Sequence, residues 1–377
     1  MKKTKIFAAY LPQYHETPEN NLFWGKGFTD WVGVKNAKPQ FEGHQQPVVP
    51  LNKNYYDLSQ TETLRWQASL AKKYKVDGFN IYHYWFKDGK KMLETPPENL
   101  LDNTDINIEF YFTWDNSSWV RSWGNIRENA WAPAFDTQAE QGKKTLLQFE
   151  YGDKEAWKQH FEYLCPFFLD RRYFKIQGKP VFGFMKTRDE KILQEMCSYW
   201  DALAKEQGLP GMYFLTSKKI FLNKCVLDGQ FMYQPNYSGW GRREAFEGRL
   251  ERYFHIKPKR DEPVKYRFDY KKIWKNILGT ANHGNCKNEF YGAIVGFDDT
   301  PRRGKNARIL VGKSPAIFEK CFKNLYEISC KQEKEFMLIT AWNEWGEGAY
   351  LEPDTENGYA YLEALKRAVE SVDAENA

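Results

Sequence analysis

The chain of 377 residues carries 55 basic and 50 acidic side chains, a net charge of +5, and this near balance argues against a nucleic-acid-binding protein. The hydrophobic fraction of 42% supplies a sizeable core, yet no stretch approaches the ~20 apolar residues that a membrane span requires. The aromatic fraction of 17% exceeds what a core requires, and surplus rings typically line a groove that binds sugars or bases.

The N-terminus and the cysteines bear on the compartment in which the protein works. Met1 to Lys5 resembles the start of a signal peptide, but the apolar run that follows, Ile6 to Leu11, is too short to continue one. The six cysteines are widely scattered and include no Cys-x-x-Cys pair, so neither a zinc site nor a disulfide framework is predicted. We therefore expect a cytoplasmic enzyme that uses no metal and no cofactor.

Runs of apolar residues alternate with amphipathic patterns along most of the chain. Eight runs rich in β-branched and aromatic residues predict the strands Lys5–Tyr10, Gly78–Tyr84, Ile108–Trp114, Pro180–Lys186, Met212–Thr216, Gly229–Gln234, Tyr291–Phe297 and Phe336–Trp342. The amphipathic patterns predict the helices Thr61–Tyr74, Lys154–Leu169, Glu190–Gln207, Ser314–Ser329 and Tyr359–Val372. Eight such strands, alternating with helices, predict an α/β protein with a (β/α)8 barrel of the TIM type. A ninth candidate strand, Leu146–Tyr151, competes for a place in it.

Three long segments separate the predicted elements: Thr17–Leu58, Asp115–Gly142 and Tyr237–Asn288. We interpret them as loop insertions on one domain that spans residues 1–377. All three are rich in aromatic residues, as is typical of loops that enclose a substrate. The third contains the one basic concentration, Lys257–Lys272, which we interpret as a solvated loop and not as a polyanion site.

The barrel prediction places the active site, because active sites of such barrels lie at the carboxyl ends of the strands. Nearly every predicted strand ends in polar, aromatic or ionisable residues, which is unexpected for independent loops. The candidate substrate-binding residues at these ends are Tyr14, His15, His83, Tyr84, Trp85, Trp114, Asp115, Asn116, Gln234, Asp298, Asp299, Trp342, Asn343 and Trp345.

The last strand carries the strongest chemical signal. It runs into a glycine-spaced loop with Glu344 and Glu347, bracketed by Trp342, Trp345 and Tyr350. Cleavage of a glycosidic bond requires two carboxyl groups, one to protonate the bridging oxygen and one to activate a nucleophile or stabilise positive charge. The indoles offer faces for sugar rings, and their apolar walls can keep one glutamate protonated. Glu344 and Glu347 are therefore the candidate catalytic pair, and the alternative is a solvated surface loop.

Several candidates have an alternative structural interpretation. Asp298 and Asp299 either bind sugar hydroxyls or cap the turn that follows them. His83 either contacts substrate or is a satisfied core histidine. Arg121, between two indoles, either clamps an anionic group or makes cation–π contacts within its loop. Trp24, with Trp31, Trp85 and Trp114, is a candidate platform for sugar rings or a core residue.

Seven sequence motifs, which cover nearly the whole chain, resemble those of one family. They are Tyr10-Leu-Pro-Gln-Tyr-His15, Trp24-Gly-Lys-Gly-Phe-Thr-Asp-Trp31, Gly43-His-Gln-Gln-Pro47, Tyr55-Tyr-Asp-Leu58, Gly78-Phe-Asn-Ile-Tyr-His-Tyr-Trp-Phe86, Asp298-Asp-Thr-Pro-Arg302 and Ala341-Trp-Asn-Glu-Trp-Gly-Glu-Gly348 with Leu351-Glu-Pro353. The chain resembles the WbsX-type proteins of surface-polysaccharide gene clusters, a group similar to glycoside hydrolase family 99.

The resemblance implies a (β/α)8 barrel that acts on a polysaccharide or lipopolysaccharide glycan. In the hydrolase family, cleavage is endo-acting and retains configuration. By motif, Glu344 would assist attack by the sugar's own 2-hydroxyl and Glu347 would be the general acid/base, without metal or nucleotide. The chain departs from the family where Trp114-Asp-Asn-Ser117 replaces the usual Trp-Ala-Asn-Glu.

Three functions remain open on the sequence. The leading hypothesis is a retaining endo-type glycoside hydrolase of a bacterial polysaccharide. The first alternative is a glycosyltransferase of O-antigen or capsule assembly, although no glycine-rich phosphate-binding loop follows a predicted strand. The second is a sugar-binding protein without catalysis. Each takes an oligosaccharide or polysaccharide as its partner.

Overall fold

The computed structural model of the protein describes residues 2–121, 144–217, 227–240, 266–284 and 286–375. Within them, nine strands pair in parallel in the order β12-β10-β9-β8-β4-β2-β1-β15-β13. They are β1 (Lys5–Tyr10), β2 (Gly78–Trp85), β4 (Glu109–Trp114), β8 (Lys179–Phe184), β9 (Tyr213–Thr216), β10 (Gly229–Phe231), β12 (Glu289–Phe290), β13 (Gly292–Ile294) and β15 (Phe336–Thr340).

The two ends of this sheet belong to one segment of chain. Only Tyr291 separates β12 from β13, and the segment pairs with β10 through β12 and with β15 through β13. The sheet therefore closes on itself. The eight predicted strand runs correspond to all of its strands except β12, which lies directly before the predicted run Tyr291–Phe297. The (β/α)8 fold expected from the sequence is confirmed.

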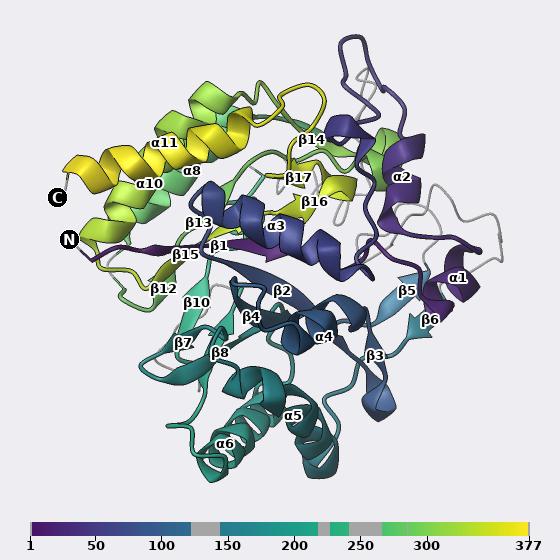
Figure 1. Ribbon diagram of the computed structural model, residues 1–377, viewed down its shortest axis with the longest axis vertical. Helices are drawn as coiled ribbons and strands as arrows, with labels where there is room; N and C mark the ends of the chain where they lie inside the picture. The colour runs from purple at the N-terminus through teal and green to yellow at the C-terminus, as the bar shows by residue number, and fades with distance from the viewer. Residues whose placement is uncertain (1, 122–143, 218–226, 241–265, 285, 376–377) are drawn as a thin grey trace, which may run out of the picture.

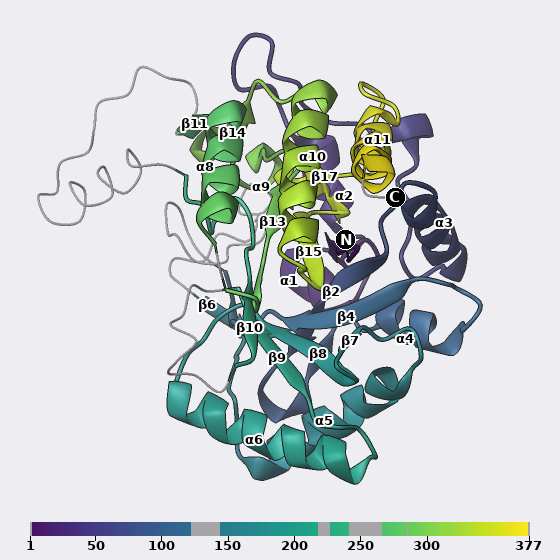
Figure 2. The same cartoon turned by 90° about the vertical axis from the view of Figure 1, so that its left-hand side faces the viewer.

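Helices surround the barrel, as Figure 1 and Figure 2 show. They are α3 (Thr61–Lys73), α4 (Thr95–Asp102), α5 (Lys154–Leu169), α6 (Glu190–Glu206), α8 (Tyr270–His283), α10 (Pro315–Lys331) and α11 (Ala360–Glu375). Side-chain caps start several of them, since Asp153, Asp269 and Ser314 each accept a hydrogen bond from the backbone N–H three residues on. The five helices predicted from amphipathic patterns are all present, within two or three residues at their ends.

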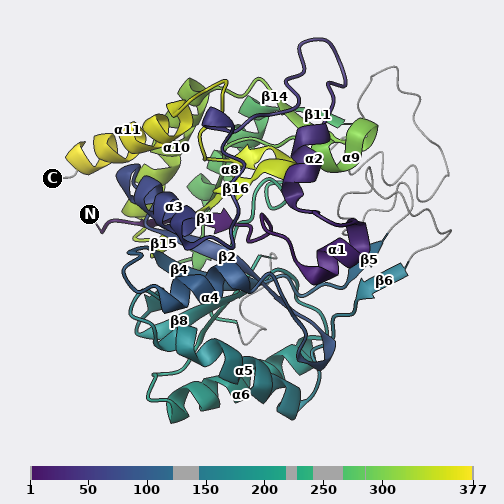
Figure 3. The ribbon, with the colours of Figure 1, turned by 45° about the vertical axis from the view of Figure 1, so that its right-hand side comes forward.

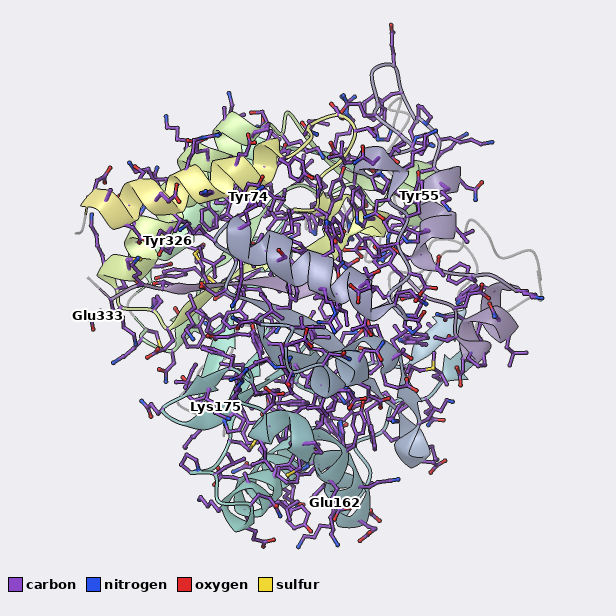
Figure 4. The ribbon with its side chains drawn as sticks, in the orientation of Figure 1. Tyr55, Tyr74, Glu162, Lys175, Tyr326 and Glu333 are labelled. Carbon is purple, nitrogen blue, oxygen red and sulfur yellow. The ribbon has the colours of Figure 1, made fainter. Side chains whose placement is uncertain are left out.

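Contacts between helices complete the outer layer and bring the chain ends together. Tyr326 of α10 donates a hydrogen bond to Asp373 of α11 over 3.4 Å. The ring of Tyr74, which follows α3 and is labelled in Figure 4, stacks on Tyr359, which precedes α11. The N- and C-termini lie on the same side of the barrel, at the amino end of β1 (Figure 1). No helix in the described ranges is long and apolar enough to pass through a bilayer.

Aromatic rings fill the amino-terminal end of the barrel. Phe7 packs on Phe174 at 4.7 Å between ring centroids and edge-on against Tyr111 at 5.1 Å, and Phe336 packs against all three. Six tryptophans (Trp114, Trp119, Trp200, Trp274, Trp342 and Trp345) are among the largest fully buried side chains. Much of the unusual aromatic content is thus core, and only part of it is available to a substrate.

Two sequence expectations need correction. The ninth candidate strand, Leu146–Tyr151, only overlaps β6 (Lys144–Leu147), which pairs antiparallel with β5 (Trp119–Arg121) outside the barrel. The predicted loops also contain regular structure. Thr17–Leu58 holds α1 (Pro18–Trp24) and α2 (Asp30–Asn36), and Tyr237–Asn288 holds α8 and the strand β11 (Tyr266–Asp269), which pairs with β14 (Arg308–Val311). The described end of the basic stretch Lys257–Lys272, interpreted as a solvated loop, therefore lies in β11 and α8. The helix α8 was missed in the sequence because the lysines on its outer face obscured the apolar pattern of its inner face.

Close packing requires a glycine at position 292, where β13 begins and the barrel closes; we call this closure between β12 and β13 the seam. A Cβ at Gly292 would lie 1.7 Å from the carbonyl oxygen of Met232 in the neighbouring chain segment, whereas a Cβ at Gly279 in α8 would meet nothing within 4 Å. We expect Gly292→Ala to destabilise the protein by about 3 kcal/mol or more. Gly279→Ala, the matched control, should stabilise it by up to ~1 kcal/mol because alanine favours helix. Urea unfolding of both variants measures this, and equal stabilities would contradict the seam packing.

Candidate active site

The loop after β15 is fixed against the end of β1. Asn343 begins the short strand β16 (Asn343–Glu344). Its side-chain amide accepts a hydrogen bond from Leu11 N over 2.8 Å and donates one to Leu11 O over 3.0 Å. Tyr14 donates its hydroxyl hydrogen to Asn343 O over 2.6 Å and accepts from Trp345 N over 3.0 Å. Tyr14 and Asn343 thus hold the backbone that carries the two candidate glutamates.

One buried guanidinium bridges three carboxylates at the carboxyl end of the barrel. Arg302 lies in the short helix α9 (Thr300–Arg303), and Asp30 begins α2 (Asp30–Asn36). Arg302 Nη1 donates to Glu347 over 2.7 Å, while Nη2 contacts Glu344 at 3.1 Å and Asp30 at 3.2 Å. Figure 3 shows α2, α9 and β16 together on the side of the barrel away from the termini. We call Arg302, Asp30, Glu344 and Glu347 the carboxylate cluster.

Gly346, between the two glutamates, permits the close approach of Arg302 and Asp30 to the loop. A Cβ there would lie 2.5 Å from a carboxylate oxygen of Asp30 and 2.7 Å from Nε of Arg302. Any side chain at position 346 would therefore displace the guanidinium. The spacing Glu-Trp-Gly-Glu gives two carboxyl groups and room for the cation between them.

The two glutamates differ in environment. The side chain of Glu344 is 5% exposed and that of Glu347 is 26% exposed. Burial raises the pKa of Glu344 to about 8; Arg302 opposes this rise, and the charges of Glu347 and Asp30 add to it. Glu344 therefore carries a proton at pH 7 in the free protein, and Glu347 is the glutamate that solvent reaches.

Two tyrosine hydroxyls lie near the glutamates. Tyr82 of β2 and Tyr233, two residues after β10, have their hydroxyl oxygens 2.5 Å apart. Burial raises the pKa of both phenols well above 10, and the charges of Glu344 and Glu347 raise them further. Both phenols are neutral at any working pH, so the pair keeps hydroxyl hydrogens for hydrogen bonding.

A third buried glutamate supports the loop from behind. Glu352 accepts hydrogen bonds from Tyr56 over 2.8 Å, from Gln67 over 2.7 Å and from the indole N–H of Trp345 over 2.7 Å. Burial raises the pKa of Glu352 to about 7, and these hydrogen bonds oppose the rise. Trp345 is 1% exposed and stacks on Tyr350 at 3.8 Å between centroids, and Trp342 is fully buried. Both tryptophans hold the loop and offer no open face to a sugar.

Asp298 and Asp299 anchor the helix that carries Arg302. Asp298 accepts hydrogen bonds from His44 and Gln46, each over 2.8 Å, and its backbone N–H donates to Glu347 O over 2.6 Å. Burial alone would raise the pKa of Asp298, but hydrogen bonds from His44, Thr300 and Gln46 outweigh it and hold the pKa below its ordinary value. Asp299 accepts from Arg308 N over 2.6 Å and pairs with Arg303 at 2.7 Å, while burial raises its pKa to about 7. Both carboxylates are engaged within the protein.

Three of the candidate aromatic residues face the helices. His83 lies 2.7 Å from His160 of α5 between Nε2 atoms, Trp85 stacks on the same ring at 4.3 Å, and Trp114 meets it edge-on at 4.7 Å. Alternate residues of a strand point to opposite faces, so Tyr82 and Tyr84 face the other way. Burial raises the pKa of Tyr84 well above 10, and the charges of Asp115 and Glu344 raise it further.

The remaining candidates have mixed positions. Asn116 is tied to the backbone of Lys186 by hydrogen bonds of 2.6 and 2.9 Å, and Gln234 is fully buried and accepts from Ser238 N over 3.2 Å. His15 is buried, which lowers its pKa. Trp24 ends α1 (Pro18–Trp24) and packs beside Phe28. Arg121 ends β5, and its side chain lies outside the described residues.

The sequence analysis did not single out four residues of this centre. They are Arg302, Asp30, Tyr82 and Glu352. Each lies in a motif that carried the family resemblance, and strand alternation from Tyr84 could have found Tyr82. Nothing local marks Arg302 or Asp30, because their roles depend on the meeting of α2, α9 and β16.

The raised pKa of Glu344 has a consequence for stability. An unfolded chain ionises this carboxyl near 4.5, but the folded protein resists ionisation up to about 8, so stability falls as the pH rises between these values. Glu344→Gln removes that loss. We expect the variant to unfold a few degrees higher than the wild type at pH 8, with no such gain at pH 4.5. Thermal unfolding at both values measures it, with Glu327→Gln on α10 as control, and a difference independent of pH would contradict the burial of a proton at Glu344.

Comparison of the sequence with known families and proteins gave consistent matches. The model of the family described as Glycosyltransferase WbsX matches residues 6–365. Two proteins named "Uncharacterized protein WxcX", from Xanthomonas campestris pv. campestris strains B100 and ATCC 33913, are 28% and 27% identical over 372 residues, which is 97% of this chain. The alignments cover 49% of each relative, so the chain spans about half the length of the curated relatives it matches.

Two solved structures share the fold. The GH99 endo-alpha-mannosidase from Bacteroides thetaiotaomicron matches with a TM-score of 0.55 and 13% identity, covering 100% of both chains. A structure described as a glycoside hydrolase-like protein matches with a TM-score of 0.58 and 12% identity, covering 98% of this chain and 94% of that one. At sequence identities this low, the similarity shows a shared fold alone.

Proposed function

The chain belongs to the family described as Glycosyltransferase WbsX, as its motifs predicted, and we propose that it is a glycoside hydrolase that cleaves within a polysaccharide. The observation that carries this proposal is the carboxylate cluster at the carboxyl end of the barrel. Its guanidinium contacts Glu344 and Glu347 simultaneously, and the more buried of the two holds a proton at neutral pH. One protonated and one ionised carboxyl group are what glycosidic cleavage requires.

The reaction follows from these two states. The protonated carboxyl gives its hydrogen to the bridging oxygen as the bond from that oxygen to the anomeric carbon breaks. The ionised carboxylate takes the proton of the sugar's own 2-hydroxyl as that oxygen bonds to the anomeric carbon. Water then attacks the anomeric carbon and breaks this new bond; the first carboxyl group regains its proton from the water, and the 2-hydroxyl regains its proton from the second. We assign the neutral hydroxyl pair of Tyr82 and Tyr233, beside the two glutamates, to hydrogen bonding with the sugar.

The motif resemblance gives the acid role to Glu347, whereas in the free site Glu344 holds the proton. If Glu344 is the acid, activity falls as the pH rises through about 8. If Glu344 is instead the base that assists the 2-hydroxyl, the proton passes to Glu347 when the glycan binds, and activity again falls as the pair loses its one proton near pH 8. The pH profile therefore reports the proton of the pair, and the dependence on the leaving group distinguishes the two assignments.

Reducing-end release from a panel of bacterial surface polysaccharides tests the proposed activity. The assay contains chelator and no nucleotide sugar. We expect release by the wild type, a loss of ~10²-fold or more in Glu344→Gln and in Glu347→Gln, and no loss in Glu327→Gln, a carboxylate that pairs with Lys331 on the outer helix α10. Undiminished release by both cluster variants would refute the catalytic pair.

Leaving-group dependence identifies the acid. An aryl glycoside with an activated leaving group needs no protonation, so the variant that lacks the acid should cleave it within about tenfold of wild type and still lose ~10²–10⁴-fold on the natural linkage. The variant that lacks the base should lose activity on both substrates. Equal losses for both variants on both substrates would contradict a division of roles.

A glycosyltransferase is the second candidate, and the description of the family favours it. In that case, glycan turnover appears only when a nucleotide sugar is supplied. Product formation that requires the nucleotide sugar, with no release of reducing ends in its absence, would replace the hydrolase with a transferase.

A further inference from the structure

The carboxylate cluster contains more negative groups than its cation can balance. Arg302 is buried, with 10% of its side chain exposed, and its terminal nitrogens lie within 3.2 Å of carboxylate oxygens from Asp30, Glu344 and Glu347. One positive charge against three ionised carboxylates leaves two uncompensated negative charges in a region with little water. Burial of such charge is expensive unless one carboxylate takes a proton.

The distances show how the two terminal nitrogens of Arg302 are distributed among the three carboxylates. Nη1 contacts Glu347 at 2.7 Å, whereas Nη2 contacts both Glu344 at 3.1 Å and Asp30 at 3.2 Å. Asp30 thus competes with Glu344 for the same nitrogen. Without the carboxylate of Asp30, one guanidinium would face two glutamates, and the cluster would need no proton to reach the same net charge.

From this geometry we infer that Asp30 and Arg302 are positioning residues that keep one proton on the Glu344–Glu347 pair at neutral pH. The inference rests on the proposed function for its purpose, because acid/base cleavage needs that proton. Asp30 supplies the negative charge that retains the proton. Arg302 holds the two glutamates together through its contacts with both carboxylates.

The other titratable groups around the cluster do not supply this effect. Those whose charges act on Glu344, Glu347 or Arg302 within the described residues are Tyr14 after β1, Tyr82 and Tyr84 of β2, Tyr233 after β10, and Asp299 at the start of α9. The tyrosines stay neutral because burial raises their pKa values well above 10. Asp299 is already paired with Arg303 and the backbone of Arg308.

Titration of the glutamate carboxyl carbons in the free protein tests the inference without any substrate. The protein is labelled with ¹³C at the glutamate carboxyl, and Glu344→Gln and Glu347→Gln assign the two signals. In the wild type we expect one of the two glutamates to stay protonated to near pH 8. In Asp30→Asn its midpoint should fall by about one pH unit or more, since a negative neighbour is lost and Nη2 becomes available to Glu344 alone.

Variants of Arg302 give the opposite shift. Arg302→Met removes the cation and should raise the midpoints of both glutamates, while Arg302→Lys should return them toward the wild type. Asp102→Asn, an exposed aspartate at the end of α4, is the matched control and should leave both midpoints unchanged. Should Arg302→Met fail to fold, Asp30→Asn, which keeps the size of the side chain, decides the question alone.

Unchanged midpoints in folded Asp30→Asn would overturn the inference, whatever the protein's activity. The proposed function is judged separately. If the midpoints shift as expected but no glycan is cleaved, the inference stands and the hydrolase proposal falls. If the wild type cleaves glycan, one limb of its pH–activity profile reports this proton. In Asp30→Asn that limb should shift in the same direction as the titration midpoint of the glutamate carboxyl carbon. A uniform loss of kcat with no shift of that limb would show a purely structural role.

Discussion

The contact of one guanidinium with three carboxylates is the constraint on which the rest of the site depends. Arg302 joins α9 to α2 through Asp30 and to the loop after β15 through Glu344 and Glu347. A buried ionic group of this kind is tolerated only when nearly every partner is satisfied. The surrounding structure meets that demand, since Asp298 and Asp299 fix the start of α9 and Gly346 leaves room for the cation.

A second set of buried polar groups positions the cluster, and one of them, Tyr14, also contacts Asp30 through its hydroxyl over 3.3 Å. Asn343 and Tyr14 tie the last strand's loop to the end of β1, and Glu352 holds the indole of Trp345 from behind. Glu344, Glu352 and Asp299 all have pKa values raised by burial, to about 8, about 7 and about 7. Several carboxyl groups with raised pKa values at one end of a barrel reduce the stability of the fold as the pH rises. That arrangement is expected where local structure serves chemistry at the expense of stability.

The sequence predicted the scaffold better than the centre. Barrel strands such as β1 and β15 are continuous apolar runs, which are recognisable without tertiary information. Strand-end residues were harder to place, because adjacent residues point to opposite faces. His83 and Trp85 therefore pack on α5, while their neighbours Tyr82 and Tyr84 face the cluster. Arg302 and Asp30 lie 272 residues apart in sequence, and no local pattern could bring them together.

Neutron diffraction from crystals of the free protein at pH 7 would test the central claim most directly, because it locates hydrogen on individual oxygen atoms. The account predicts a deuteron on Glu344 and a fully protonated Arg302 in contact with Asp30, Glu344 and Glu347. Two bare glutamates, or a guanidinium that has left either of them, would contradict it.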